Sequence, residues 1–107
     1  MLPLPQPHQS HDGLLIGHIL HIDTFGNLTT NIKKDNLPQA GEEITIIVGN
    51  QRIQRLNNTY ADGKGLLALI GSSGYLEIAV NGGSACALLD AKLGDGLTIR
   101  RHQSGSK

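Results

Sequence analysis

The sequence predicts an all-β protein: a small antiparallel β-barrel of six or seven strands with one short helix. Its apolar residues come in short segments, several of which alternate as in a strand with one buried face. Turn-forming residues separate these segments, and 14 glycines among 107 residues favour turns over long helices. Closing the sheet into a barrel would remove exposed strand edges, which a chain with so few charges protects poorly.

The first predicted strand, residues 14–22, has two apolar faces. We expect Leu15 and Ile19 on one face, and Gly17 at a bulge or a close approach of another chain segment. The residues expected on the opposite face are Leu14, Ile16, Leu20 and Ile22.

The remaining elements follow from the same pattern. Gly49-Asn50 fits a two-residue hairpin turn, and Ser73-Gly74 a second turn. Ser84 is placed to cap a short helix over residues 85–89, and Gly94-Asp95-Gly96 ends the segment between this helix and the last strand. The further predicted strands are residues 28–32, 43–48, 51–56, 66–70, 75–80 and 97–101.

The expected domain organisation is simple. Residues 1–12 hold three of the four prolines and are interpreted as a flexible linker or tail. Residues 13–102 form the barrel, and residues 103–107 are a polar tail.

The composition excludes several classes of protein. Nine basic residues balance nine acidic ones, and only three residues are aromatic, so we expect no nucleic-acid partner. No apolar run approaches the ~20 residues that cross a bilayer, so we expect no membrane partner. Residues 1–13 do not have the pattern of a signal peptide. Cys86 is the only cysteine, which excludes an internal disulfide and favours a reducing, cytoplasmic compartment.

The five histidines do not predict a metal site. His8 and His11 lie in the proline-rich start of the chain. His18 and His21 are an odd number of residues apart on one strand, which places them on opposite faces. No zinc-binding spacing results, and we expect no metal.

The first candidate for function is the loop after residue 22. Asp23, Phe25 and Asn27 supply an acid, an aromatic ring and an amide within five residues, and Gly26 permits a tight turn. Such a loop can stack a flat ring on Phe25 and read its edge with the Asn27 amide, which both donates and accepts, as adenine does. The structural alternative, favoured for the loop alone, is that Phe25 plugs the barrel and the polar residues only shape the turn.

The second candidate is the stretch 71–84. Ser72 and Ser73 offer hydroxyls and backbone N–H groups that suit a carboxylate, while Gly82 and Gly83 allow backbone to approach a ligand closely. The alternative is two ordinary corners plus a helix cap. Tyr60, an aromatic residue in a polar loop, is a third candidate, and its alternative is a surface tyrosine that covers the barrel mouth.

Two motifs in this order resemble a known family. They are DTFGNLTTNI at residues 23–32 and GSSGYLEIAVNGGSA at residues 71–85, with Tyr60 between them. The stretch from about residue 13 to 99 resembles the C-terminal domain of the S-adenosylmethionine hydroxide adenosyltransferases, hydrolases related to fluorinases and chlorinases. The resemblance implies an antiparallel barrel behind a larger α/β domain. It also implies a homotrimer whose sites lie between the N-terminal domain of one subunit and the C-terminal domain of its neighbour.

The resemblance also implies a role for each candidate residue. Asp23 would hold the methionine ammonium, and Ser72 and Ser73 its carboxylate. Phe25 and Tyr60 would pack on adenine, and Asn27 and the Gly82 backbone would recognise its edge. Val80 would line the pocket. The implied reaction is attack of water on C5′ of S-adenosylmethionine, which gives adenosine and methionine; no further cofactor is implied. The halogenating relatives carry arginine at the position of Ser73, so serine here favours the hydrolase.

These residues do not include the large N-terminal domain that holds the ribose and the attacking water in the family. We assign no catalytic residue, because Glu77 and His21, the only tempting bases, are interpreted as solvated strand residues. The isolated domain is therefore expected to be inactive. The alternative is a non-catalytic barrel that binds a nucleoside or mediates assembly.

Overall fold

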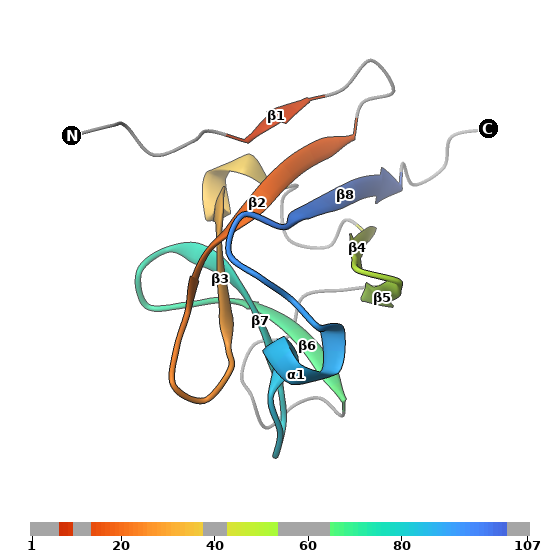
Figure 1. Ribbon diagram of the computed structural model, residues 1–107. Helices are drawn as coiled ribbons and strands as arrows, with labels where there is room; N and C mark the ends of the chain where they lie inside the picture. Colours follow the sequence, from red (N-terminus) through yellow and green to blue (C-terminus); the bar gives the residue numbers. More distant parts are fainter. Residues whose placement is uncertain (1–6, 10–13, 38–42, 54–64, 103–107) are drawn as a thin grey trace.

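The structure of the protein is a computed structural model, and it describes residues 7–9, 14–37, 43–53 and 65–102. Eight strands and two short helical segments form this part of the chain (Figure 1). The strands are β1 (His8–Gln9), β2 (Leu15–Ile22), β3 (Leu28–Lys33), β4 (Glu43–Val48), β5 (Gln51–Ile53), β6 (Leu66–Ile70), β7 (Tyr75–Val80) and β8 (Gly96–His102). The helical segments are the 3₁₀ turn η1 (Lys34–Asn36) and α1 (Ala85–Leu89).

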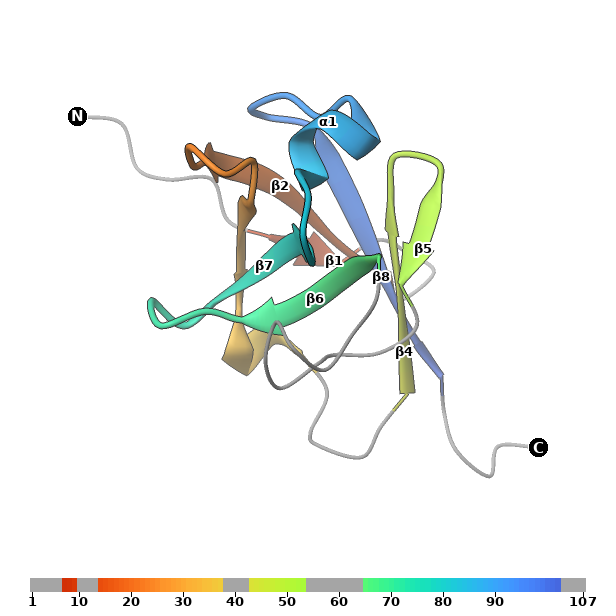
Figure 2. The same cartoon turned by 90° about the horizontal axis from the view of Figure 1, so that it is seen from below.

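Seven strands form one antiparallel sheet in the order β5-β4-β8-β2-β3-β7-β6. The sheet curls until its end strands β5 and β6 approach each other, which makes a nearly closed barrel (Figure 2). The two-residue strand β1 pairs with β2 outside this path, at Ile16 and Leu15. The predicted all-β barrel with one short α-helix is confirmed, and residues 8–9 of the expected tail join the sheet.

The core lies inside the barrel and comes from alternate positions on most strands. Leu76 and Ile78 of β7 point inward, as do Ile44 and Ile46 of β4, and all four are buried. Leu97 and Ile99 of β8 join them in one apolar cluster. This period of two is the pattern from which the strands were predicted.

Strand β2 departs from its predicted faces. Ile22 packs against the same core as Leu15 and Ile19, although it was expected on the opposite face. The cause is a register shift in the β2–β3 pairing between Ile19 and His21, because a β-bulge reverses the alternation beyond it. The same shift removes the basis for placing His18 and His21 on opposite faces. Gly17 is not at the bulge, but it does make the predicted close approach, against Ile32.

Strand β3 contains a second irregularity, which a buried hydroxyl stabilises. The β3–β7 register shifts between Thr29 and Lys33. There the Thr30 hydroxyl donates to the Leu76 carbonyl at 2.9 Å and accepts from the Ile32 N–H at 3.1 Å. Thr30 is fully buried, so its side chain satisfies backbone groups that water cannot reach.

The predicted turns and the helix cap are present. Gly49 has φ +60° in the two-residue turn between β4 and β5. The Ser84 side chain accepts from the Ala87 N–H at the start of α1, as expected of an N-cap. Strand β5 ends at Ile53, and residues 54–56 of the predicted strand lie outside the described residues.

Candidate functional site

The β2–β3 loop, residues 23–27, is held closed by Asp23. One carboxylate oxygen, Oδ1, accepts hydrogen bonds from the backbone N–H groups of Phe25 and Asn27, both at 2.9 Å. The other, Oδ2, accepts from the Asn27 amide Nδ2 at 3.2 Å. The backbone closes the same turn, because Asp23 N–H donates to the Asn27 carbonyl and Gly26 N–H to the Asp23 carbonyl. Asp23 therefore shapes the loop as an Asx turn does.

These hydrogen bonds favour the ionised form of Asp23. The Asn27 backbone N–H is the largest cause that lowers the pKa of this carboxyl, whereas partial burial opposes it. The Phe25 N–H, the Asn27 side chain and the charge of nearby His21 lower the pKa further. A carboxylate has about four acceptor positions. Three of them are used within the loop, so one remains for a ligand donor.

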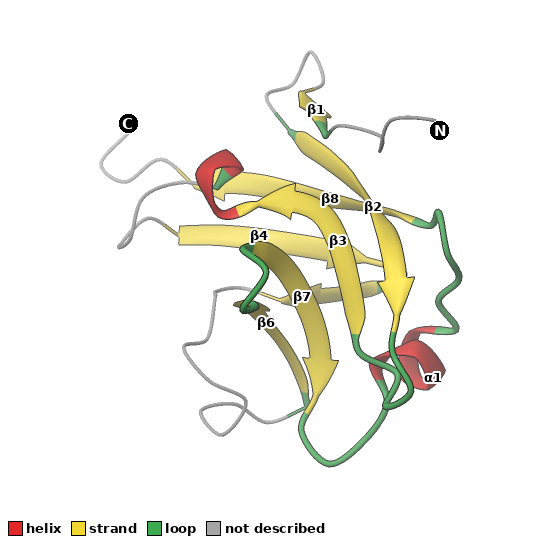
Figure 3. Ribbon diagram, turned by 90° about the vertical axis from the view of Figure 1, so that its left-hand side faces the viewer, coloured by secondary structure: helices red, strands yellow, loops and turns green. Residues whose placement is uncertain are grey.

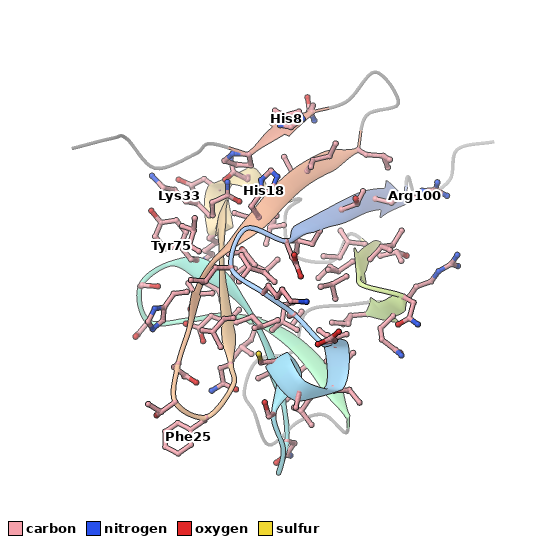
Figure 4. The ribbon with its side chains drawn as sticks, viewed as in Figure 1. His8, His18, Phe25, Lys33, Tyr75 and Arg100 are labelled. Atoms are coloured by element: carbon pink, nitrogen blue, oxygen red, sulfur yellow. The ribbon has the colours of Figure 1, made fainter. Side chains whose placement is uncertain are left out.

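The loop presents its ring to solvent. Phe25 is 76% exposed at the tip of the loop, and its ring projects away from the barrel (Figure 4). It is not the hydrophobic plug of the alternative interpretation. Asn27 is half-buried, and its side-chain Nδ2 donates to Asp23. The loop thus offers an aromatic face with amide groups beside it.

The start of α1 holds this loop from the other side. The Gly26 carbonyl accepts from the Cys86 backbone N–H at 2.9 Å. The Ser84 side chain lies against the Cα of Gly26, with no room for a side chain at position 26. Residues 23–27 and the turn before α1 are therefore neighbours, although almost 60 positions apart in the sequence.

That turn, residues 81–84, leaves backbone accessible beside the loop. Gly82 is exposed with φ +80°, and a Cβ built there would meet nothing within 4 Å. The Gly83 N–H donates to the Val80 carbonyl at 3.1 Å and closes the turn. Val80 is half-buried and packs against the barrel core below.

The turn that carries Ser72 and Ser73 lies at the opposite end of β7. Figure 3 shows the β6–β7 turn near η1, whereas the β2–β3 loop and α1 share the other end of the barrel. The register agrees, because Leu28 pairs with Ile78 while Lys33 pairs with Tyr75. A strand of six residues spans roughly 17–20 Å. The structure thus joins Phe25 and Asn27 to the Gly82 turn and separates them from the two serines.

The Ser72–Ser73 turn has a basic neighbourhood of its own. Both serines are exposed, and the turn is closed by hydrogen bonds of Gly71 and Gly74. The Lys34 N–H donates to the Gly74 carbonyl at 3.0 Å. The Lys33 ammonium lies 5.9 Å from the centre of the Tyr75 ring, and Figure 4 shows the pair far from Phe25. Hydroxyls two and three residues from Tyr75, over whose ring the Lys33 ammonium lies, suit an anionic group.

Sequence reasoning missed three contributors to these surfaces. Ser84 was expected only to cap the helix, and Lys33 and Lys34 were interpreted as a solvated loop. No local sequence signal reveals the Gly26–Ser84 contact, since it joins distant segments. Tyr60 lies outside the described residues.

Two further features, a metal site and a membrane-spanning helix, were sought among the described residues. Within them, no three histidine, cysteine or acidic side chains lie close enough to hold a metal ion. None of their helices is long and apolar enough to cross a membrane.

The fold is that of a small antiparallel β-barrel domain with an exposed ring–amide loop at one end. Residues 17–98 match the family described as the SAM hydroxide adenosyltransferase C-terminal domain, where SAM is S-adenosylmethionine. This chain therefore belongs to that family, and the predicted resemblance is confirmed.

Two solved structures show the same barrel within longer proteins. An uncharacterised conserved protein from Thermotoga maritima is 32% identical with a TM-score of 0.76, over 94% of this chain and 40% of that one. A conserved hypothetical protein from Thermus thermophilus is 30% identical with a TM-score of 0.63, over 79% of this chain and 34% of that one. This chain thus spans less than half the length of either relative. A family defined as a C-terminal domain implies an N-terminal partner domain.

Proposed function

We propose that this chain is the adenosyl- and methionine-binding C-terminal domain of an S-adenosylmethionine hydrolase, inactive without an N-terminal α/β domain. One observation carries the proposal: the exposed Phe25 ring and the Asn27 amide flank Gly26, which contacts Ser84 two residues after the exposed Gly82 backbone. The family of the chain supports S-adenosylmethionine as the substrate.

The adenine end of the ligand belongs at this corner. Phe25 would stack on the purine, and the exposed face of the Gly82 turn would let backbone reach its edge. The Asn27 carbonyl oxygen would accept from the exocyclic amine of adenine, and its second amide hydrogen is available to a ring nitrogen. Val80 would form the floor and Tyr60 a further wall.

The amino-acid end needs a different assignment from the one that the resemblance implies. The ammonium and the carboxylate of methionine sit on the same carbon atom. The β3–β7 register puts the length of β7 between Asp23 and the Ser72–Ser73 turn, which favours separate roles for them. Asp23 already accepts three hydrogen bonds within its own loop. We therefore keep the carboxylate at Ser72 and Ser73, close to Lys33, and assign Asp23 the role of organiser of the loop.

The chemistry requires groups from outside this chain. The oxygen of water attacks C5′, the C5′–S bond breaks with its electron pair going to sulfur, and the water loses a proton. A sulfonium leaving group needs no acid, but the water must be oriented and deprotonated. Asp23 accepts three hydrogen bonds within its own loop and Glu77 lies against Gly71, so we assign the base to neither of them. The N-terminal domain would supply the base.

A partner surface at the same end of the barrel supports this division. The exposed large apolar side chains of the described residues are Phe25, Leu88 and Leu93, on the β2–β3 loop, on α1 and on the segment after α1. Contact with an α/β domain would cover them. A homotrimer with shared sites and a cytoplasmic location are further parts of the proposal, the latter supported by the free thiol of Cys86.

Nuclear magnetic resonance titrations of the chain with adenosine and with methionine test the two assignments separately. Adenosine should shift the amide resonances of Phe25, Asn27 and Gly82, and methionine those of Ser72 and Ser73. If methionine instead shifts the resonance of Asp23 and not that of Ser72, Asp23 would be the residue that binds the methionine ammonium. Adenosine release from S-adenosylmethionine should appear only when the α/β domain is added, and release by the chain alone would refute the proposed division.

A non-catalytic nucleoside-binding module is the second candidate. It is favoured because Asp23 is hydrogen-bonded within its own loop and Glu77 lies against Gly71, which leaves neither carboxylate to act as the base. Phe25→Ala and Asn27→Ala distinguish the two functions in the full-length protein. In a hydrolase they lower turnover of S-adenosylmethionine together with adenosine binding, whereas in a binding module only adenosine binding falls and no turnover exists.

A further inference from the structure

We propose that the small size of Ser84 lets the Phe25–Asn27 loop dock on α1, which makes position 84 a positioning residue for that loop in addition to a helix cap. The ligand part of this inference rests on the proposed adenosyl-binding function. Its structural part stands on contacts within the chain.

Two contacts converge on the Ser84 hydroxyl. Its Oγ accepts a hydrogen bond from the Ala87 N–H at 3.1 Å, which caps α1. The same side chain packs against Gly26, where the φ of +85° and the missing side chain permit the approach. One small hydroxyl therefore touches both the helix start and the loop.

The backbone adds a second connection beside the first. The Cys86 N–H is one of the first amides of α1 and has no partner within the helix; it donates instead to the Gly26 carbonyl at 2.9 Å. Gly26 lies directly between Phe25 and Asn27, and Asp23 ties both of these to the same turn. Any displacement of Gly26 from α1 thus moves the ring and the amide together.

Side-chain size separates the positioning role from the capping role. Serine, asparagine and aspartate cap helices about equally well. Serine is the smallest of the three, and its Oγ already occupies the space that a Cβ on Gly26 would need. Ser84→Asn keeps an acceptor for the Ala87 N–H but forces Gly26 away. Ser84→Ala removes the acceptor and leaves Gly26 in place.

Amide hydrogen exchange of the chain tests this without a ligand. In Ser84→Asn, the Cys86 amide should lose protection while the Ala87 amide keeps it. In Ser84→Ala, the Ala87 amide should lose protection while the Cys86 amide keeps it. Unchanged protection of Cys86 in Ser84→Asn, or equal loss of it in both variants, would overturn the proposal and leave Ser84 as a helix cap only.

Adenosine titration of the same variants tests the consequence for the site. We expect Ser84→Asn to weaken adenosine binding by about tenfold or more, and Ser84→Ala by less than about threefold. If both variants bind adenosine as the unmodified chain does, the positioning role is refuted. If the unmodified chain binds no adenosine, the proposed function fails, and the exchange experiment still decides the positioning role.

Discussion

Gly17 of β2 lies so close to Ile32 of β3 that a Cβ at position 17 would stand 2.5 Å from the Ile32 Cγ1 atom and 2.8 Å from the Asn31 Oδ1 atom. Ile32 and Asn31 are both buried, so neither side chain has free space into which to move. The Asn31 oxygen also accepts from the His18 backbone N–H at 2.8 Å. The absence of a side chain at position 17 thus lets β2 and β3, the strands on either side of the candidate loop, pack together.

Gly17→Ala should therefore destabilise the barrel by about 1–3 kcal/mol, because the added methyl group overpacks a buried site. Denaturant unfolding measures the change. Gly96→Ala on the neighbouring strand β8 is the matched control, since a Cβ there would lie 3.7 Å from the nearest atom, an ordinary contact. Equal stability of Gly17→Ala and the unmodified chain would contradict the close packing.

Thr30→Val should cost about 1–3 kcal/mol of unfolding free energy, although the two side chains have nearly the same shape. The valine leaves the Ile32 N–H without the acceptor that the Thr30 hydroxyl supplies at the β3 irregularity. Thr30→Ser retains the hydroxyl and should recover most of that loss. If valine is as stable as threonine, the hydroxyl does not stabilise the irregularity.

Asp23 should make the domain sensitive to acid. Its pKa in the folded chain is below the ordinary value of 3.8, so this carboxylate stabilises the fold at pH values above 3.8. That contribution is lost as the pH falls from 3.8 through the folded pKa, because the unfolded chain binds the proton more readily. Melting temperatures between about pH 6 and pH 2 should fall less steeply for Asp23→Asn than for the unmodified chain. The same slope for both proteins would show that Asp23 gains nothing from its loop.

Phe25→Ala should leave stability almost unchanged, within about 0.5 kcal/mol, because the ring is exposed and buries little. The same change should weaken adenosine binding by about tenfold, as expected when a stacked aromatic ring is removed. Leu88→Ala is the control, since it removes another exposed apolar side chain, of 55% exposure, without touching the ring loop. Loss of adenosine binding in Leu88→Ala to the same extent would assign the effect to general surface change rather than to stacking.

The local sequence pattern was sufficient to predict the strands, the turns and the helix cap. Alternation of apolar residues in β7 and β8, glycine in the β4–β5 turn and serine at position 84 each act through neighbours a few residues away. The family could also be predicted from local sequence, since each of its two motifs is continuous in the chain. The sequence by itself therefore determined the fold class and the residue types at the candidate site.

Only the tertiary structure decided how these residues are arranged. The bulge in β2 depends on pairing with β3, so Ile22 could not be assigned to the core from alternation alone. The contact of Gly26 with Ser84 joins Phe25 and Asn27 to the Gly82 turn, while the length of β7 keeps Ser72 and Ser73 apart from them. The physical reason is that side-chain period acts over a few residues, whereas distances between loops depend on strand register and on which end of each strand a loop follows.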